Sequence, residues 1–143
     1  MRITSDAHLD HGLHESVVAH IAERFADRDA FFVETFELPP ELPTAMCALY
    51  GPELGDEPVP DSEVVLEVRG TRAGPSRLCS RPPRATRTVT VVAGPHEGEP
   101  CVLYTAFGGP PSAREPWDPT LTTPAQVAHS RSFWAKHALA RGA

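Results

Sequence analysis

Four of the seven histidines lie between residues 8 and 20, and the first three, His8, His11 and His14, recur at every third position. Imidazole nitrogens bind metal ions and also transfer protons near neutral pH, so the spacing allows a metal site or a catalytic helix. Two aspartates nearby would add oxygen ligands. A glycine interrupts the helix that would align these groups, and no further ligand motif follows. We therefore expect no tightly bound metal ion and no cofactor.

His20 is a separate candidate, for proton transfer. Val17, Ile21 and Phe25 recur at helical spacing, and His20 lies with Arg24 at the border of this apolar stripe. From that border both side chains can reach toward a neighbouring sheet. Histidine suits general acid or base catalysis near neutral pH, which makes His20 a candidate catalytic residue and Arg24 a candidate substrate ligand. A solvent-facing histidine without a chemical role is the alternative.

A run of arginines occupies the middle of the chain. Residues 68 to 96 include six arginines and no acid, so this stretch has a charge of +6 and the remainder has a charge of −12. We name this set the arginine belt: Arg69, Arg72, Arg77, Arg81, Arg84 and Arg87. Guanidinium groups suit phosphate and carboxylate recognition. The belt therefore indicates either an anionic partner, such as RNA or another phosphate-bearing ligand, or pairing with carboxylates of the same chain.

A third candidate site follows the apolar segment CVLYTAF, residues 101–107. Strand alternation would place Tyr104 and Thr105 on opposite faces, and the segment leads into a loop rich in glycine and proline that carries Arg114 and Trp117. An arginine beside a tryptophan can hold a phosphate or stack on a base. Alternatively, Trp117 covers the end of the core. Neither a phosphate-binding glycine loop nor a familiar hydrolase motif is present.

The elements that must position these residues follow an α+β pattern. Helices are predicted over residues 13–26 and, after Thr123 as N-cap, over residues 124–141. Between them lie short runs of β-branched and aromatic residues, each closed by Gly or Pro, which predict an antiparallel sheet of about five strands flanked by the two helices. Residues 29–43 suit a strand or a short helix equally. The predicted core includes Val17, Ile21, Phe25, Val89, Val91, Leu103 and Phe133.

Composition sets the broad class. A chain of 143 residues with 41% hydrophobic and 22% charged residues is typical of one globular domain, here residues 1–143, and sixteen prolines predict many loops. No apolar run approaches the ~20 residues that cross a bilayer, and no signal peptide is evident, so we expect a cytoplasmic protein without a membrane partner. Cys47, Cys79 and Cys101 are far apart and odd in number, which predicts buried residues without a disulfide framework.

The order of these features resembles that of the small metal-independent ribonucleases grouped with barnase, EndoU, colicin and RelE toxins. The resemblance rests on the helix HESVVAHIAERF, on a sheet with a basic middle, and on the last strand VLYTAFGGP, where many members read vTAyPG. It implies that a helix histidine, a strand arginine and a hydroxyl group act together on RNA. The catalytic residues would be His20, Arg87, Tyr104 and Thr105, and the substrate-binding residues would be Arg24, Arg84, Arg114 and Trp117.

Such a site needs no metal ion. A base removes the proton of a ribose 2′-OH, a cation stabilises the charge on the phosphoryl oxygens, and an acid protonates the leaving 5′-oxygen. The alternative class is a non-enzymatic protein-binding or accessory module, whose acidic surface meets a basic protein partner. A nuclease requires His20, a belt arginine and the hydroxyl of Tyr104 or Thr105 to face one cleft, whereas a binding module does not. The sequence does not determine whether the protein is an enzyme or what its oligomeric state is.

Overall fold

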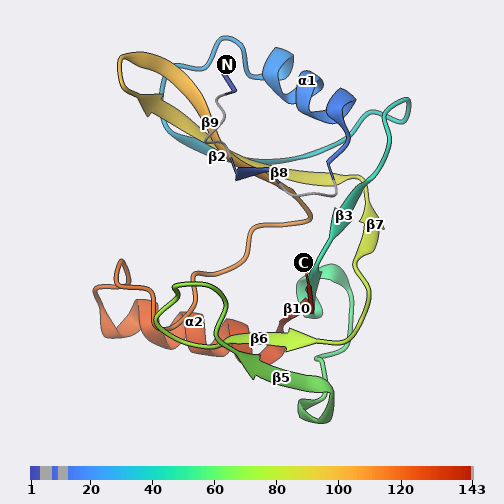
Figure 1. Cartoon of the computed structure of the whole chain (residues 1–143), viewed down its shortest axis with the longest axis vertical. Coiled ribbons are helices and arrows are strands. Elements are labelled where there is room, and N and C mark those ends of the chain that lie inside the picture. The colour runs from blue at the N-terminus through green and yellow to red at the C-terminus, as the bar shows by residue number, and fades with distance from the viewer. Residues whose placement is uncertain (4–7, 10–12, 143) are drawn as a thin grey trace. The chain divides into compact units, whose positions relative to one another are not determined.

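The computed structural model describes residues 1–3, 8–9 and 13–142. The chain forms two compact units, each assembled from two stretches of sequence. Unit 1 comprises Met1–Cys47 and Arg84–Pro111, and unit 2 comprises Ala48–Pro83 and Ser112–Ala143. Two helices and several antiparallel strand pairs confirm the α+β class (Figure 1). The assignment of residues 1–143 to one domain stays a prediction.

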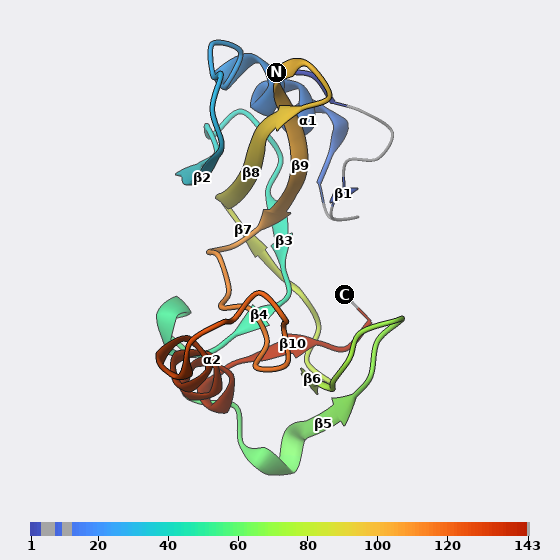
Figure 2. The same ribbon diagram turned by 90° about the vertical axis from the view of Figure 1, so that its left-hand side faces the viewer.

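Unit 1 is built around a four-stranded sheet with the strand order β1, β9, β8, β2. β8 (Thr88–His96) pairs antiparallel with β2 (Phe32–Glu37) and with β9 (Glu99–Gly108), and β1 (His8–Leu9) pairs parallel with β9. Figure 2 shows β8 and β9 side by side as the long strands of this sheet. The helix α1 (Glu15–Arg24) covers one face of the sheet. Residues 32–37, which suited a strand or a helix, are therefore a strand.

A short antiparallel pair completes unit 1, formed by β3 (Ala45–Cys47) and β7 (Arg84–Thr86). The core of the unit lies between α1 and the sheet, where apolar side chains of the helix meet those of β8 and β9. All seven residues predicted to be buried are buried in the structure. The helix is shorter than predicted because His14 caps it: the Ser16 N–H donates to His14 Nδ1 at 3.1 Å.

The pairing of β8 with β9 contains a β-bulge. Val92 lies opposite Thr105, but the next residue of β8 lies opposite Leu103, so Tyr104 is an extra residue on β9. Leu103 and Ala106 both belong to the core on the side of α1. The side chains of Tyr104 and Thr105 between them therefore both lie on the face away from α1. The prediction that they occupy opposite faces is wrong, because the bulge interrupts the alternation.

Unit 2 contains a second four-stranded sheet, with the strand order β4, β10, β6, β5. The strands are β4 (Leu49–Tyr50), β10 (Ala138–Ala140), β6 (Ser76–Cys79) and β5 (Val64–Glu67). β10 runs parallel to β6, and the other pairs are antiparallel. The prediction of one sheet of about five strands flanked by both helices is wrong: the described strands form three sheets, and each unit contains one of the helices.

Unit 2 also holds the short 3₁₀ helices η1 (Pro52–Leu54) and η2 (Asp61–Glu63) and the helix α2 (Pro124–Lys136). As predicted, α2 begins after the N-cap Thr123, which forms a capping box with Gln126. The predicted extension of the helix to residue 141 is wrong. The chain becomes extended at His137, and β10 then inserts between β4 and β6 because sheet pairing there outweighs local helix propensity.

The three cysteines are buried and free, as the sequence predicts. Across the described ranges, neither α1 nor α2 has the length and apolar character that a bilayer-spanning helix requires. The cytoplasmic location stays a prediction.

Candidate functional site

α1 places His20 and Arg24 together beside β2. The ring of His20 lies 6.0 Å from the ring of Phe36, and the guanidinium carbon of Arg24 lies 4.5 Å from the centroid of the same ring. Nε2 of His20 is buried and has no hydrogen-bond partner among the described residues. Arg24 and Arg28 both pair with Glu34, at 3.8 Å for Arg24 Nη2. The predicted pair of His20 and Arg24 thus shares one location, with a carboxylate next to it.

Arg87, the predicted phosphate ligand, forms hydrogen bonds with the backbone of its own unit. Its Nη1 donates to the carbonyl oxygens of Pro39 at 3.0 Å and Leu42 at 2.8 Å. These bonds hold the loop after β2 against the start of β8, and the side chain is half-buried. Arg84 lies in β7 opposite Cys47, and it also has a partner within the chain.

The hydroxyl groups of Tyr104 and Thr105 lie on the other side of the sheet from His20. His20 contacts Phe36, which belongs to the core beneath α1. Tyr104 and Thr105 lie on the face away from α1, where the Tyr104 hydroxyl donates to the Pro95 carbonyl. The sheet therefore separates the predicted base from the predicted hydroxyls, and these residues do not face one cleft.

Belt arginines in unit 2 are paired with acids from other parts of that unit. The pairs are Arg72 with Glu115 at 3.2 Å, Arg77 with Asp61 at 3.0 Å and Arg81 with Glu63 at 2.9 Å. Arg69 also has a partner in the chain. Hydrogen bonding to Glu63 raises the pKa of Arg81, so this guanidinium remains charged. The arginine belt contains no acid in the sequence, but in the structure these three arginines form ion pairs with acids from elsewhere in the chain.

Trp117 anchors the loop before α2. A Cβ added to Gly74 would lie 2.3 Å from Cδ1 of Trp117, so the indole packs directly on the glycine backbone. Its Nε1 donates to the Pro75 carbonyl at 3.4 Å. The half-buried ring is therefore used for packing within unit 2.

Arg114 belongs to the same loop and bonds within it. Its Nη1 donates to the Thr120 hydroxyl, and its backbone carbonyl accepts a hydrogen bond from Ser130 Oγ. Asp118 Oδ1 accepts from the hydroxyl and the N–H of Thr120, the latter at 2.8 Å. These hydrogen bonds, together with the charge of Arg114, lower the pKa of Asp118. Arg114 and Trp117 lie in unit 2, whereas the other six predicted site residues lie in unit 1.

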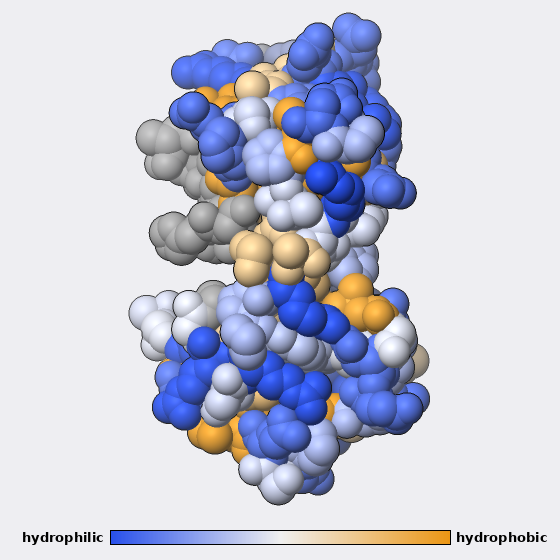
Figure 3. Space-filling model, turned by 90° about the vertical axis from the view of Figure 1, so that its right-hand side faces the viewer, coloured by the Kyte–Doolittle hydropathy of each residue, from blue (hydrophilic) through white to orange (hydrophobic). Residues whose placement is uncertain are grey.

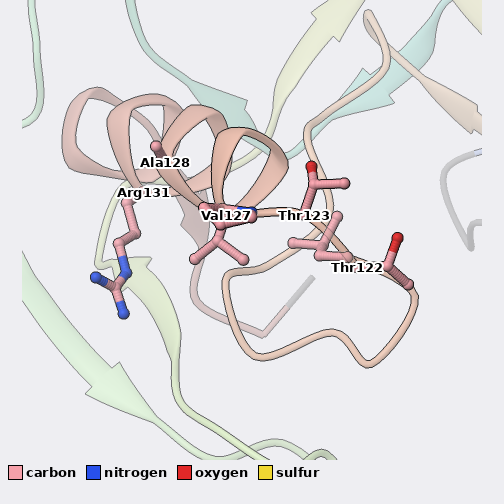
Figure 4. Close-up of a pocket in the computed structure, with 7 residues that line it drawn as sticks. Thr122, Thr123, Val127, Ala128 and Arg131 are labelled. Atoms are coloured by element: carbon pink, nitrogen blue, oxygen red, sulfur yellow. The ribbon is translucent and has the colours of Figure 1, made fainter.

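An open groove runs beside the first turns of α2 (Figure 4). Its lining consists of Leu121, Thr122, Thr123, Pro124, Val127, Ala128 and Arg131. Arg131 and Val127 project from the same side of the helix. The N–H groups of Thr122 and Thr123 donate to Gln126 Oε1, at 2.9 and 3.0 Å. Because the capping box already uses these donors, this helix end does not present them to a phosphate.

No three described His, Cys, Asp or Glu side chains gather as metal ligands would. The candidate set of His8, His11 and His14 falls largely outside the described residues, since only the backbone of His8 and the whole of His14 are described. His14 serves as the N-cap of α1.

Two sheet edges are the surface features that sequence reasoning missed. β2 is one of the two outer strands of the unit 1 sheet, and β5 is one of the two outer strands of the unit 2 sheet. Large apolar side chains at or next to these strands are exposed: Phe31, Val33, Val65, Leu66 and Val68. Figure 3 shows apolar side chains, in orange, reaching the surface among hydrophilic ones. The sequence signals the strands themselves but not their position at an edge.

No known protein family model matches the chain, and no curated protein or solved structure is significantly similar to it. Its function is therefore inferred from the arrangement of its own residues.

Proposed function

We propose that this protein is a protein-binding module that accepts an extended, basic segment of a partner along the outer edge of β2. The observation that supports this proposal is that β2 directs a row of backbone N–H and C=O groups outward, next to exposed apolar side chains. Addition of a strand to a sheet edge is a common mode of peptide recognition, in which the main chain supplies affinity and alternate side chains supply specificity.

The direction of the backbone groups follows from the register of β2 and β8. The Leu38 N–H donates to the Arg87 carbonyl at 2.6 Å, in continuation of the antiparallel register. Residues 32, 34 and 36 therefore direct their N–H and C=O groups toward β8, and Val33, Thr35 and Glu37 direct theirs outward. Among the strands that the structure describes, none pairs with β2 on that side.

The side chains at this edge provide an apolar anchor. Phe31 is 62% exposed and Val33 is 50% exposed. The ring of Phe31 lies 6.4 Å from the ring of Tyr104, so the two aromatic groups share the face away from α1. Large apolar side chains exposed together at an edge strand commonly mark a partner site.

Charge defines the kind of partner. Exposed acids without an ion pair among the described residues lie on β2 and on the segments that precede and follow it along the chain: Glu23, Asp27, Asp29, Glu37 and Glu41. Unit 1 contains eleven acidic and five basic residues, a net charge of −6. A segment with alternating apolar and basic side chains fits this edge. A second copy of β2 does not, because pairing would bring acidic flanks together.

An RNA- or phosphate-binding protein with metal-independent nuclease activity stays a prediction with less support. The sheet lies between His20 and the hydroxyls of Tyr104 and Thr105. The belt arginines all have partners within the chain.

The test uses a fluorescent peptide of alternating valine and lysine. Binding should slow hydrogen exchange at the amides of Val33, Thr35 and Glu37, because the added strand accepts their hydrogen bonds. Val33→Lys should weaken binding by about tenfold or more, equivalent to ~1.4 kcal/mol. Val65→Lys, a matched substitution at an exposed valine of β5, should leave binding unchanged.

The outcomes separate the two functions. An absence of peptide binding, or protection of amides outside β2, would contradict the β2 proposal. Labelled single-stranded RNA provides the parallel measurement: cleavage that disappears in His20→Ala, with retention that falls steeply with salt, would instead establish the nuclease.

A further inference from the structure

We infer that β5 pairs with β5 of a second copy of this chain, so that the protein forms a homodimer through the outer edge of the unit 2 sheet. This inference is independent of the function proposed for β2, because it rests on a different strand in a different unit.

The backbone of β5 also directs a row of groups outward. The Arg141 N–H donates to the Cys79 carbonyl at 2.7 Å, so Cys79 directs its backbone groups toward β10 and Leu78 directs its groups toward β5. Leu78 lies opposite Val65. The N–H and C=O groups of Val65 therefore face β6, whereas those of Leu66 point to the outer edge. No described strand pairs with β5 on this side.

The side chains of this edge are apolar and exposed. Leu66 is 66% exposed, Val68 is 58% exposed and Val65 is 42% exposed. The one charged residue of the strand, Glu67, pairs with Arg141 at 3.2 Å. Proline and lysine, the residues that commonly prevent edge pairing, are absent from residues 63–69.

The sequence of this edge is complementary to itself. Residues 63–69 read EVVLEVR. When two such segments pair antiparallel about Leu66, Leu66 faces Leu66 of the second copy, Val64 faces Val68, and Glu63 faces Arg69. The two-fold axis repeats each contact, so the interface is closed and isologous. Apolar side chains then meet on one face, and no acid lies opposite another acid.

Other registers are less favourable. If the second copy were shifted by one residue, the outward N–H and C=O groups of one β5 would lie opposite residues of the other β5 whose backbone groups are already bonded to β6. Antiparallel pairing about Val65 would place Glu63 opposite Glu67 of the second copy, and pairing about Glu67 would place two glutamates face to face. Pairing about Leu66 keeps the acids apart and places Leu66, the most exposed apolar residue of β5, at the axis. It also distinguishes β5 from β2, whose flanks are acidic.

Cysteine cross-linking tests the register. The native cysteines are buried, so wild type should not cross-link. Leu66→Cys should give a disulfide-linked dimer under mild oxidation, because residues directly opposite in such a pair have Cα atoms ~5.5 Å apart. Val68→Cys is the matched control: it is similarly exposed but faces Val64 of the second copy, and it should remain largely uncross-linked. Equal cross-linking of both variants, or none at Leu66→Cys, would overturn the proposed pairing.

Sedimentation equilibrium tests the dimer itself. Wild type should show a concentration-dependent doubling of its 15.5 kDa mass. Leu66→Lys should weaken self-association by about tenfold or more, because two lysines would face each other at the axis. Val33→Lys, on the other sheet edge, should self-associate as wild type does. A wild type that remains monomeric at every concentration, or a Leu66→Lys variant that dimerises equally well, would refute the inference.

Discussion

At the scale of single residues, the backbone of Gly51 in unit 2 leaves no space for a side chain. Gly51 has φ +149°, and a Cβ there would lie 2.2 Å from Cδ2 of His137. That imidazole is buried and stacked on the ring of Phe133, with centroids 3.9 Å apart, so it has no room to move away. The backbone of Gly51 thus forms one wall of the His137 site.

Gly51→Ala should therefore destabilise the protein by about 3 kcal/mol or more, through overpacking added to backbone strain. Gly55→Ala is the control, since its φ of +79° is also strained but nothing lies within 4 Å of its added Cβ. Urea unfolding followed by circular dichroism measures both variants. Equal losses of stability would show that the contact with His137 is unimportant.

The carboxylate of Asp118 carries a pH-dependent contribution. Hydrogen bonds from Thr120 lower its pKa below the ordinary 3.8. The stabilisation is therefore fully present above the pKa of the unfolded chain and disappears as the pH falls through the lower pKa of the folded chain. Asp118→Asn should be less stable than wild type at about pH 6, and the difference should be smaller at about pH 2. Chemical unfolding at both values checks this; a difference that is equally large in acid would contradict it.

At the scale of elements, a buried hydroxyl joins three segments of unit 1. Thr90 of β8 is fully buried, and its Oγ1 donates to the Gly109 carbonyl at 2.7 Å while lying 2.9 Å from Thr35 Oγ1 of β2. It thus connects the end of β9 with the edge strand.

Replacing Thr90 by Val keeps the shape of the side chain but leaves the Gly109 carbonyl without its donor. The expected loss is about 1–3 kcal/mol, the cost of an unsatisfied buried polar group. Thr90→Ser, which keeps the hydroxyl, should lose less. Equilibrium unfolding compares the two variants, and a Val variant as stable as wild type would refute this role.

The two edge strands show how side-chain chemistry distinguishes elements of the same kind. Both β2 and β5 direct outward a row of backbone groups with which no described strand pairs. β2 has acidic flanks and suits the proposed basic segment, whereas β5 is flanked by Glu63 on one side and Arg69 on the other and suits the proposed second copy. Edge geometry supplies the hydrogen bonds, and charge selects the partner.

At the scale of the whole molecule, charge is divided unequally between the units. Unit 1 has a net charge of −6, and unit 2 has eight acidic and eight basic residues. The arginine belt contributes to the neutrality of unit 2, because its guanidinium groups there pair with Asp61, Glu63 and Glu115. The net negative charge of unit 1 favours the proposed basic partner over RNA.

Salt should therefore separate the two proposed interactions. Raising NaCl from about 0.05 to about 0.5 M should weaken binding of the valine–lysine peptide severalfold, because it screens exposed charges. Dimerisation through β5 should change little, since apolar contacts dominate and exposed ion pairs contribute little. Fluorescence anisotropy and sedimentation measure the two in the same buffers. A dimer that dissociates as readily as the peptide would contradict this assignment.

The sequence by itself determined the features that depend on neighbouring residues. The spacing of Val17, Ile21 and Phe25 predicted α1 and its buried face, and Thr123 with Pro124 predicted the start of α2. The β-branched runs predicted most of the strands. These features follow from helical or strand periodicity and from capping, which act over a few residues.

Only the tertiary structure decided which distant segments meet. It ended α2 at Lys136 to form β10, placed Tyr104 in a bulge away from His20, and brought acids to the belt arginines. It also left β2 and β5 at sheet edges. Strand pairing, bulges and ion pairs join residues far apart in the sequence, so local propensity does not specify them. For that reason the sequence did not reveal that the sheet separates His20 from Tyr104 and Thr105.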